Sequence, residues 1–192
     1  MTYLFLGLGN MGVEYAETRH NIGWLFLDFV ARKNEAGEFT LDKKSQSYLT
    51  KTKLEIQAKN SPVILAKPTT YVNTTGPVVA KLKTLNKLKP EHIIIIQDDL
   101  DIDFGSFKLS FDRNSGGHRG VESIIKALKT KAFWRLRFGT RNSKLKKAYA
   151  LPEKKKDDFI KDFVLAKFTP SEKEELKPLF KSALERLAQK TQ

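Results

Sequence analysis

His92-Ile93-Ile94-Ile95-Ile96-Gln97, followed by Asp98-Asp99-Leu100-Asp101, is the stretch that decides the fold. It is the most strongly β-branched run of the chain, and β-branched side chains suit the pleated surface of a strand. We therefore expect residues 92–97 to form a central strand of a sheet. The aspartates, with Asp103 after them, come at the end of this strand, where open α/β sheets place their ligands.

Short apolar runs alternate with amphipathic stretches on both sides of this strand. The apolar runs predict further strands at residues 3–8, 47–56, 62–66, 107–111 and 134–138. Apolar residues at helical spacing predict helices at 22–32, 75–88, around 124–128 and near 171–190. This alternation is typical of an α/β or α+β layer fold, and the length fits one domain over residues 1–192. The lysine-rich residues 141–158 are expected to be flexible.

Composition limits both the compartment and the partner. The chain of 192 residues has no cysteine, which excludes disulfide scaffolds, thiolate zinc sites and cysteine nucleophiles and favours a reducing compartment. Residues 3–8 are too few to cross a bilayer and lack the flanks of a signal peptide, so neither secretion nor membrane insertion is expected. A formal charge of +13, much of it after residue 80, favours nucleic acid as the partner.

A glycine motif after the first expected strand admits a different interpretation. Gly7-Leu8-Gly9-Asn10-Met11-Gly12 satisfies the G-x-G-x-x-G pattern of dinucleotide-binding enzymes. In those enzymes an acidic residue ends a second strand about 20 positions later. Here Asp28 falls within an expected helix, so a nicotinamide-binding enzyme is the less favoured alternative.

Two of the three histidines lie in loops suited to proton transfer. His20 lies between the first strand and the first helix, and His118 lies within Ser115-Gly116-Gly117-His118-Arg119-Gly120. His92 opens an apolar strand and is set aside. Both loop histidines can face a common cleft, where Asp98 can hold His20 in one tautomer.

The nucleophile in such a site would be water. The chain has no G-x-S-x-G elbow and no thiol, so no side chain is an obvious covalent nucleophile. An amide such as Asn73 could steady the developing oxyanion, and the set then describes an ester or amide hydrolase. A divalent metal held by Asp98, Asp99 and Asp101 is disfavoured, because the Leu100 spacer points alternate side chains apart.

These loops together resemble the bacterial-type peptidyl-tRNA hydrolases. The matching segments are residues 7–12, Glu14-Tyr15, Thr18-Arg19-His20-Asn21, Lys67-Pro68-Thr69-Thr70-Tyr71-Val72-Asn73 with Gly76, Asp98-Asp99-Leu100-Asp101, Gly116-Gly117-His118 with Gly120, Phe133-Trp134-Arg135-Leu136-Arg137 and Asp162-Phe163-Val164-Leu165. The resemblance implies a compact α/β domain with a twisted mixed sheet surrounded by helices. It also implies cleavage of the ester between a peptidyl, or N-blocked aminoacyl, group and the tRNA 3′ end, with no cofactor and no metal.

The resemblance assigns roles to individual residues. His20 becomes the general base, Asp98 keeps it basic, and Asn10 helps to select blocked aminoacyl groups. The expected tRNA-binding residues are Tyr15, Tyr71, Asn73, His118, Arg119, Lys108 and Arg137. Of these, Lys108 and Arg137 match positions that hold the terminal phosphate of tRNA. The implied partner is the acceptor stem and 3′ end of peptidyl-tRNA, bound by a cytoplasmic monomer.

Several positions depart from the family pattern. Val72 replaces a usual methionine, Gln97 often is histidine, and Arg119 replaces an asparagine. Thr140-Arg141-Asn142-Ser143 replaces a glycine-proline stretch at the start of a basic, lid-like segment near 141–158, and the C-terminal helix near 171–190 ends early. These changes leave a noncatalytic RNA-binding relative as the alternative to an enzyme.

Overall fold

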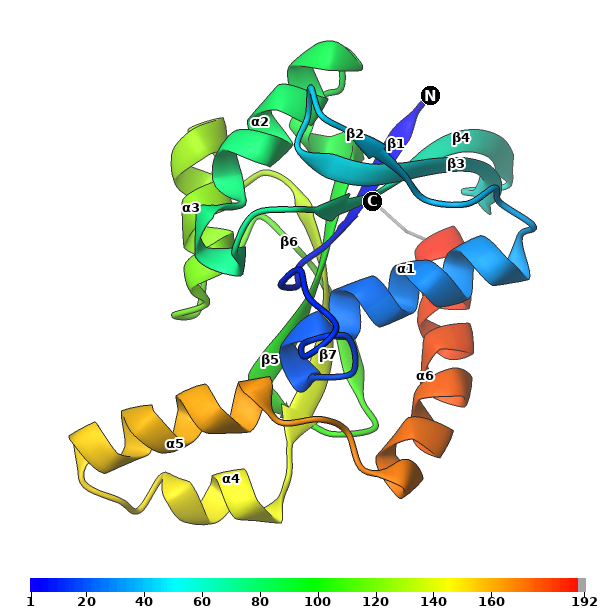
Figure 1. Cartoon of the computed structure of the whole chain (residues 1–192). Coiled ribbons are helices and arrows are strands. Elements are labelled where there is room, and N and C mark those ends of the chain that lie inside the picture. The colour runs from blue at the N-terminus through cyan, green and yellow to red at the C-terminus, as the bar shows by residue number, and fades with distance from the viewer. Residues whose placement is uncertain (190–192) are drawn as a thin grey trace.

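A seven-stranded mixed sheet with helices on both faces forms the body of the molecule in the computed structural model, which describes residues 1–189 (Figure 1). The strands are β1 (Tyr3–Gly7), β2 (Thr40–Asp42), β3 (Ser47–Ile56), β4 (Lys59–Pro68), β5 (Ile93–Asp103), β6 (Phe107–Phe111) and β7 (Trp134–Arg141). The helices are α1 (Ile22–Lys33), α2 (Gly76–Leu85), α3 (Arg119–Leu128), α4 (Ser143–Ala148), α5 (Glu153–Leu165) and α6 (Pro170–Ala188). Short 3₁₀ turns are η1 (Arg19–Asn21), η2 (Val72–Thr74) and η3 (Pro90–His92).

The strand order β2-β3-β4-β1-β5-β7-β6 places parallel strands at the centre. β4, β1, β5 and β7 are parallel neighbours, whereas β2, β3 and β6 add antiparallel pairs at the two sides. The carboxyl ends of parallel strands meet at one edge of a sheet, where ligands bind in open α/β folds. The loops that follow β1 and β4 therefore emerge beside the second half of β5.

The sheet separates two apolar cores. Successive side chains of a strand point to opposite faces, so Ile94 and Ile96 of β5 pack towards α1 and α6, while Ile93 and Ile95 pack towards α2 and α3. All four isoleucines are at most 1% exposed. Fully burying such a side chain stabilises a fold by about 1.5–3 kcal/mol, which explains why this run anchors both layers.

Glycines let the start of α1 approach the sheet closely. A Cβ on Gly23 would lie 2.5 Å from the carbonyl oxygen of Ile96 and 2.7 Å from the amide nitrogen of Leu8. Real side chains do not tolerate such distances to backbone atoms, so only glycine fits. Because His20 lies one turn before Gly23, this contact fixes η1 against β1 and β5.

The mixed sheet surrounded by helices is confirmed, and β5, which lies inside the sheet between β1 and β7, is longer than predicted. Pairing with β7 continues from Asp98 and Asp99 to Asp103, with a register shift after Asp99. The aspartates expected to follow the strand therefore lie inside its second half. Salt bridges from Asp103 to Arg141 and Lys146 accompany this extension.

Residues 141–158, expected to be flexible, are mostly helical. Asn142 caps α4 by accepting hydrogen bonds from the backbone of Lys144 and Leu145, and α5 follows after a short turn. The C-terminal helix spans Pro170–Ala188, and residue 190 of its predicted range lies outside the described residues. Within residues 1–189, no helix is both long and apolar enough to cross a membrane.

The glycine motif does not open a helix, as the dinucleotide-binding interpretation requires. Residues 11–17 form a bend and turns, and α1 begins only at Ile22. The motif instead lets the chain turn sharply between β1 and η1, since Gly12 adopts a φ of 124°.

Candidate active site

Asp98 lies at the centre of a polar cluster at the carboxyl edge of the sheet. Its side chain is only 3% exposed, and its Oδ1 accepts hydrogen bonds from His20 Nδ1 at 2.9 Å and from His118 Nε2 at 3.2 Å. A buried carboxylate is stable only when it is paired and hydrogen-bonded. The two imidazoles provide that pairing and lie stacked, with ring centroids 5.5 Å apart.

Three different elements bring these groups together. Asp98 comes from β5, His20 from η1 before α1, and His118 caps the start of α3. Gly116 and Gly117 precede His118 with φ values of 62° and 80°, in the left-handed region that glycine adopts without strain. The glycine-rich loop can therefore turn back so that His118 reaches Asp98.

The electrostatics of the cluster favour a basic His20. Burial alone would lower the pKa of His20, but the charge of Asp98 and its hydrogen bond more than offset this, so the pKa is raised. Burial alone would raise the pKa of Asp98, yet the charges and hydrogen bonds of His20 and His118 bring it well below its usual range. Asp98 is thus an anion that stabilises positive charge on His20.

The hydrogen bonds also fix which nitrogen is the base. A carboxylate only accepts, so His20 donates from Nδ1 and keeps Nε2 unprotonated. Nδ1 of His118 is buried, and no residue within 1–189 is hydrogen-bonded to it. His20, whose side chain is 18% exposed, is the imidazole free to take up a proton.

Asn10 lies beside the cluster and is held by three hydrogen bonds to two residues. Its Oδ1 accepts from the backbone N–H of Val72 at 3.1 Å, and its own backbone exchanges two 2.9 Å hydrogen bonds with the side chain of Asn21. Asn10 is 8% exposed and Asn21 is fully buried. Asn21 was missed as a site residue, and its position next to His20 in a polar run is the signal that could have identified it.

The expected tRNA-binding residues lie around this centre rather than in it. Tyr71 is 68% exposed, and Asn73 is exposed in η2, the turn whose first residue binds Asn10. Tyr15 is partly exposed in the turn before η1. Arg119 is the exposed first residue of α3, where Lys126 and, less strongly, Arg119 lower the pKa of Glu122. His118 differs from the others, because it contacts Asp98 directly.

Lys108 and Arg137 lie opposite each other on β6 and β7. Lys108 is exposed, whereas Arg137 is 23% exposed and donates from Nε to Asp99 Oδ2 at 2.8 Å. Asp99 follows Asp98 in β5, so the two carboxylates point to opposite faces of the strand. Lys108 and Arg137, the expected phosphate-binding pair, therefore lie on the opposite face of β5 from His20.

Of the three aspartates considered from the sequence as cation ligands, only Asp98 lies in the cluster that could ligate a cation. Asp99 is engaged by Arg137 and faces away from Asp98. Among residues 1–189, His20, Asp98 and His118 offer ligand atoms that all lie within 4.8 Å of one another. Two of these atoms already hydrogen-bond to Asp98 Oδ1, so a cation would have to displace both hydrogen bonds.

Comparisons with known proteins agree on one family. A family model described as peptidyl-tRNA hydrolase matches residues 4–192. The peptidyl-tRNA hydrolase of Aquifex aeolicus is 40% identical over 182 residues, covering 94% of this chain and 85% of that protein. That of Cytophaga hutchinsonii is 36% identical over 187 residues, covering 95% and 88%. A crystal structure of peptidyl-tRNA hydrolase from Acinetobacter baumannii superposes with a TM-score of 0.81 at 28% identity, covering 97% of this chain and 88% of that chain.

We predict that Asp98→Asn lowers the pKa of His20, because the substitution removes the charge that offsets burial. The imidazole C–H signals of His20, followed by NMR across pH, measure this directly. Asp99→Asn is the matched control, since Asp99 faces Arg137 and should leave the His20 titration unchanged. An unchanged His20 pKa in folded Asp98→Asn would contradict the assignment.

The same pair should make stability depend on pH. The raised pKa of His20 stabilises the fold fully below its unfolded value of about 6.5, and this contribution is lost as pH rises through the folded pKa. The lowered pKa of Asp98 stabilises the fold above about 3.9 and its contribution is lost as pH falls. Urea titrations of wild type and Asp98→Asn should therefore differ most between about pH 4 and 6.5.

Proposed function

Because the chain belongs to the peptidyl-tRNA hydrolase family and hydrolyses peptidyl-tRNA, we propose that His20 is the general base of that reaction. The observation that carries the proposal is the 2.9 Å hydrogen bond between His20 Nδ1 and the buried carboxylate of Asp98. It leaves Nε2 to accept a proton, and it places a compensating negative charge beside the imidazolium that forms.

The reaction is an attack of water on the ester carbonyl. Nε2 of His20 removes a proton from water as the oxygen bonds to the carbonyl carbon, and the carbonyl oxygen becomes an oxyanion. The tetrahedral intermediate then collapses, breaking the bond to the 3′ oxygen of tRNA, and the proton on His20 passes to that leaving oxygen. The products are a tRNA with its terminal hydroxyl restored and a free peptide carboxylic acid, which releases its proton to solvent to become a carboxylate, and no metal or cofactor enters any step.

The two asparagines act on the substrate in this proposal. Asn10 uses Oδ1 to bind the backbone of Val72, which leaves its Nδ2 as a donor. The carbonyl of an N-blocked aminoacyl group is an acceptor that a free amino group lacks, so Asn10 can favour blocked substrates. Asn73, which is exposed on the same segment as Val72, donates to the oxyanion in this proposal.

The remaining residues bind the tRNA. Tyr15 and Tyr71 offer partly or largely exposed rings on which bases of the single-stranded 3′ end can stack. Lys108 and Arg137 bind the terminal phosphate, and Arg119 binds a backbone phosphate near the cleft. His118 holds Asp98 in place beside the bound substrate. A cytoplasmic monomer that binds the acceptor stem is consistent with this assignment.

We predict that His20→Asn lowers kcat for N-acetyl-aminoacyl-tRNA by at least about 10²–10⁴-fold, the usual contribution of a general base. Release of free tRNA from the blocked and the unblocked aminoacyl-tRNA measures turnover and selectivity together. His92→Asn is the control, because His92 lies in η3 outside the cluster and should retain activity. Folded His20→Asn with near-normal turnover would remove His20 from the mechanism.

We also predict that tRNA binding weakens with salt and that Lys108→Ala flattens this dependence. Each phosphate contact contributes a slope of about 0.7–0.9 to a log-log plot of affinity against salt concentration. Lys108→Ala should lower the slope by about one such contact. Lys177→Ala, on α6, is the control with an unaltered slope. If both variants keep the wild-type slope, Lys108 does not meet a phosphate.

A further inference from the structure

Arg19, the residue before His20, is a buried cation that the reaction does not use. Its side chain is only 6% exposed, although arginine is almost never fully buried without a partner. It lies where the catalytic turn η1 meets the segment between α5 and α6. The partners of Arg19 therefore connect His20 to a distant part of the chain.

Two of the three guanidinium nitrogens make four hydrogen-bond contacts at this junction. Nη1 donates to the carbonyls of Ala166 and Lys167 at 3.1 and 3.0 Å, and Nη2 donates to both oxygens of Glu172 at 2.9 and 2.7 Å. Glu172 also closes the capping box of α6 with Thr169. The guanidinium reaches these partners from two nitrogens at once, which the single nitrogen of a lysine ammonium cannot do.

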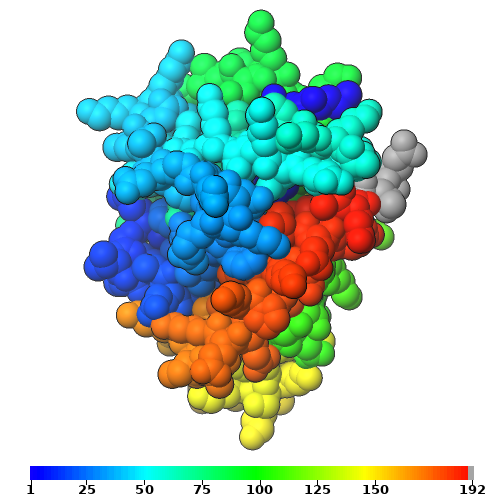
Figure 2. Space-filling view, turned by 90° about the vertical axis from the view of Figure 1, so that its right-hand side faces the viewer, coloured from blue at the N-terminus to red at the C-terminus, as the bar shows by residue number. Residues whose placement is uncertain are grey.

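Aromatic and backbone contacts complete the junction. The guanidinium lies 4.7 Å from the ring centroid of Phe163, in the last turn of α5, and 5.4 Å from that of Phe168. The backbone of Arg19 donates to Ala166, and Phe168 donates to the carbonyl of Glu17. Figure 2 shows this orange segment packed between the dark blue N-terminal segment and the start of α6.

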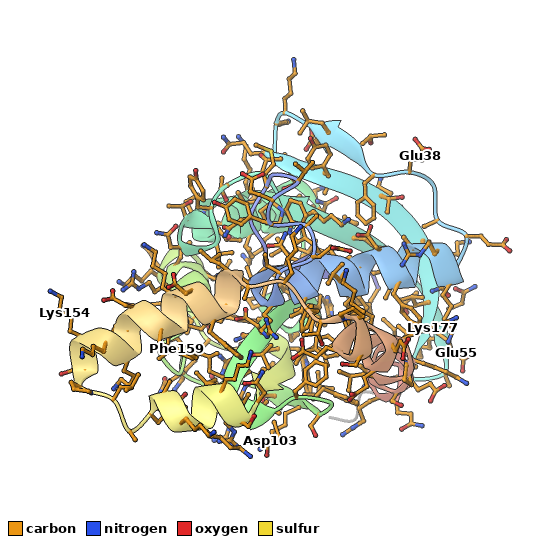
Figure 3. The ribbon with its side chains drawn as sticks, turned by 60° about the horizontal axis from the view of Figure 1, so that its bottom comes forward. Glu38, Glu55, Asp103, Lys154, Phe159 and Lys177 are labelled. Carbon is orange, nitrogen blue, oxygen red and sulfur yellow. The ribbon has the colours of Figure 1, made fainter. Side chains whose placement is uncertain are left out.

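The helices α4 and α5 form an arm that depends on this junction. The chain enters the arm from β7 and leaves it at Leu165, and α5 packs mainly against α4 and η1. In Figure 3 the two helices project side by side from the body, with Lys154 at the far end. The arm exposes lysines suited to RNA phosphates: Lys144, Lys147, Lys154, Lys155 and Lys161.

We propose that Arg19 is a positioning residue that couples the α4–α5 arm to His20, so that tRNA contacts on the arm improve the placement of the base. The proposal rests on the function assigned above. Phe163 belongs to the arm, Arg19 binds it and the segment after it, and His20 follows Arg19 directly. The Arg19 side chain therefore joins the arm to the catalytic turn, alongside the backbone hydrogen bonds at the same junction.

The test compares two substrates of different length. Arg19→Lys keeps the charge and loses the fork, and kcat is measured with N-acetyl-aminoacyl-tRNA and with the same ester on a short CCA oligonucleotide that cannot reach the arm. We expect kcat on the full tRNA to fall at least about 10-fold more than on the short substrate, since small misplacements of a catalytic group cost up to about 100-fold. Equal losses on both substrates, or none, would overturn the coupling.

A surface ion pair provides the matched control. Lys173 and Glu17 join the same two segments through a 2.6 Å contact, with side chains 41% and 48% exposed. Exposed pairs contribute little, so Lys173→Ala should change both kcat values less than about 2-fold. If Lys173→Ala reproduces the pattern of Arg19→Lys, any loosening of the junction suffices and the assignment to Arg19 fails.

A double-mutant cycle tests the route through the arm. Replacing Lys154, Lys155 and Lys161 together by glutamine should lower kcat on the full tRNA in wild type, but not further in Arg19→Lys. Additive losses would show that the arm and Arg19 act separately. If Arg19→Lys does not fold, Glu172→Gln replaces it in the test. Glu172→Gln weakens the ion pair between Arg19 and Glu172 and should give the same substrate dependence.

Hydrogen exchange separates this proposal from the proposed function. Amides of α5 and η1 should exchange faster in Arg19→Lys than in Lys173→Ala, whatever the activity. Wild-type protein that hydrolyses neither substrate would contradict the catalytic assignment, whereas unchanged exchange in Arg19→Lys would contradict the junction.

Discussion

The buried carboxylate of Asp98 is the constraint on which the site depends. An ionised carboxylate at 3% exposure is tolerated only because two imidazoles donate to the same oxygen. Those imidazoles arrive from separate loops, one before α1 and one before α3, so the charge of Asp98 holds both loops against the sheet. The same charge keeps His20 basic. The carboxylate of Asp98 therefore both stabilises the fold and supports the proposed catalysis.

The alternation of β5 divides its aspartates between two tasks. Asp98 faces His20 and His118, while Asp99 on the opposite face binds Arg137, and Asp103 binds Arg141 and Lys146. One strand thus supplies the anion for the proposed base and the anions that pair with cations of β7 and α4. A one-residue slip of β5 would exchange these faces, which explains why its register is fixed by parallel partners on both sides.

The residue pattern predicts much of the fold, because apolar periodicity is a local property. The isoleucine run, the helix after His20 and the strand at 107–111 leave clear patterns, and the family motifs point to the pair of His20 and Asp98. The length of β5 was not predictable, since charged residues disfavour a strand until the cations of β7 pair with them. Helices α4 and α5 were not predicted, because their many lysines indicate a solvent-exposed, flexible segment.

Contacts between distant segments account for the other differences. Nothing in the sequence places residue 118 within hydrogen-bonding distance of residue 98, so His118 was predicted to bind tRNA and not to bind Asp98. The sequence identifies Arg19 only as part of a family motif, because a charged residue is expected at the surface. Its burial follows from five partners that lie about 150 residues away in the chain.

The protonation of neutral His20 tests the central claim most directly. If Asp98 fixes the base, ¹⁵N NMR of wild-type protein above the pH at which His20 titrates will show the proton on Nδ1 and an unprotonated Nε2. His118, bound through its other nitrogen, should show the opposite tautomer in the same spectrum. A proton on Nε2 of neutral His20 would contradict the account, because the nitrogen facing the substrate could then accept no proton from water.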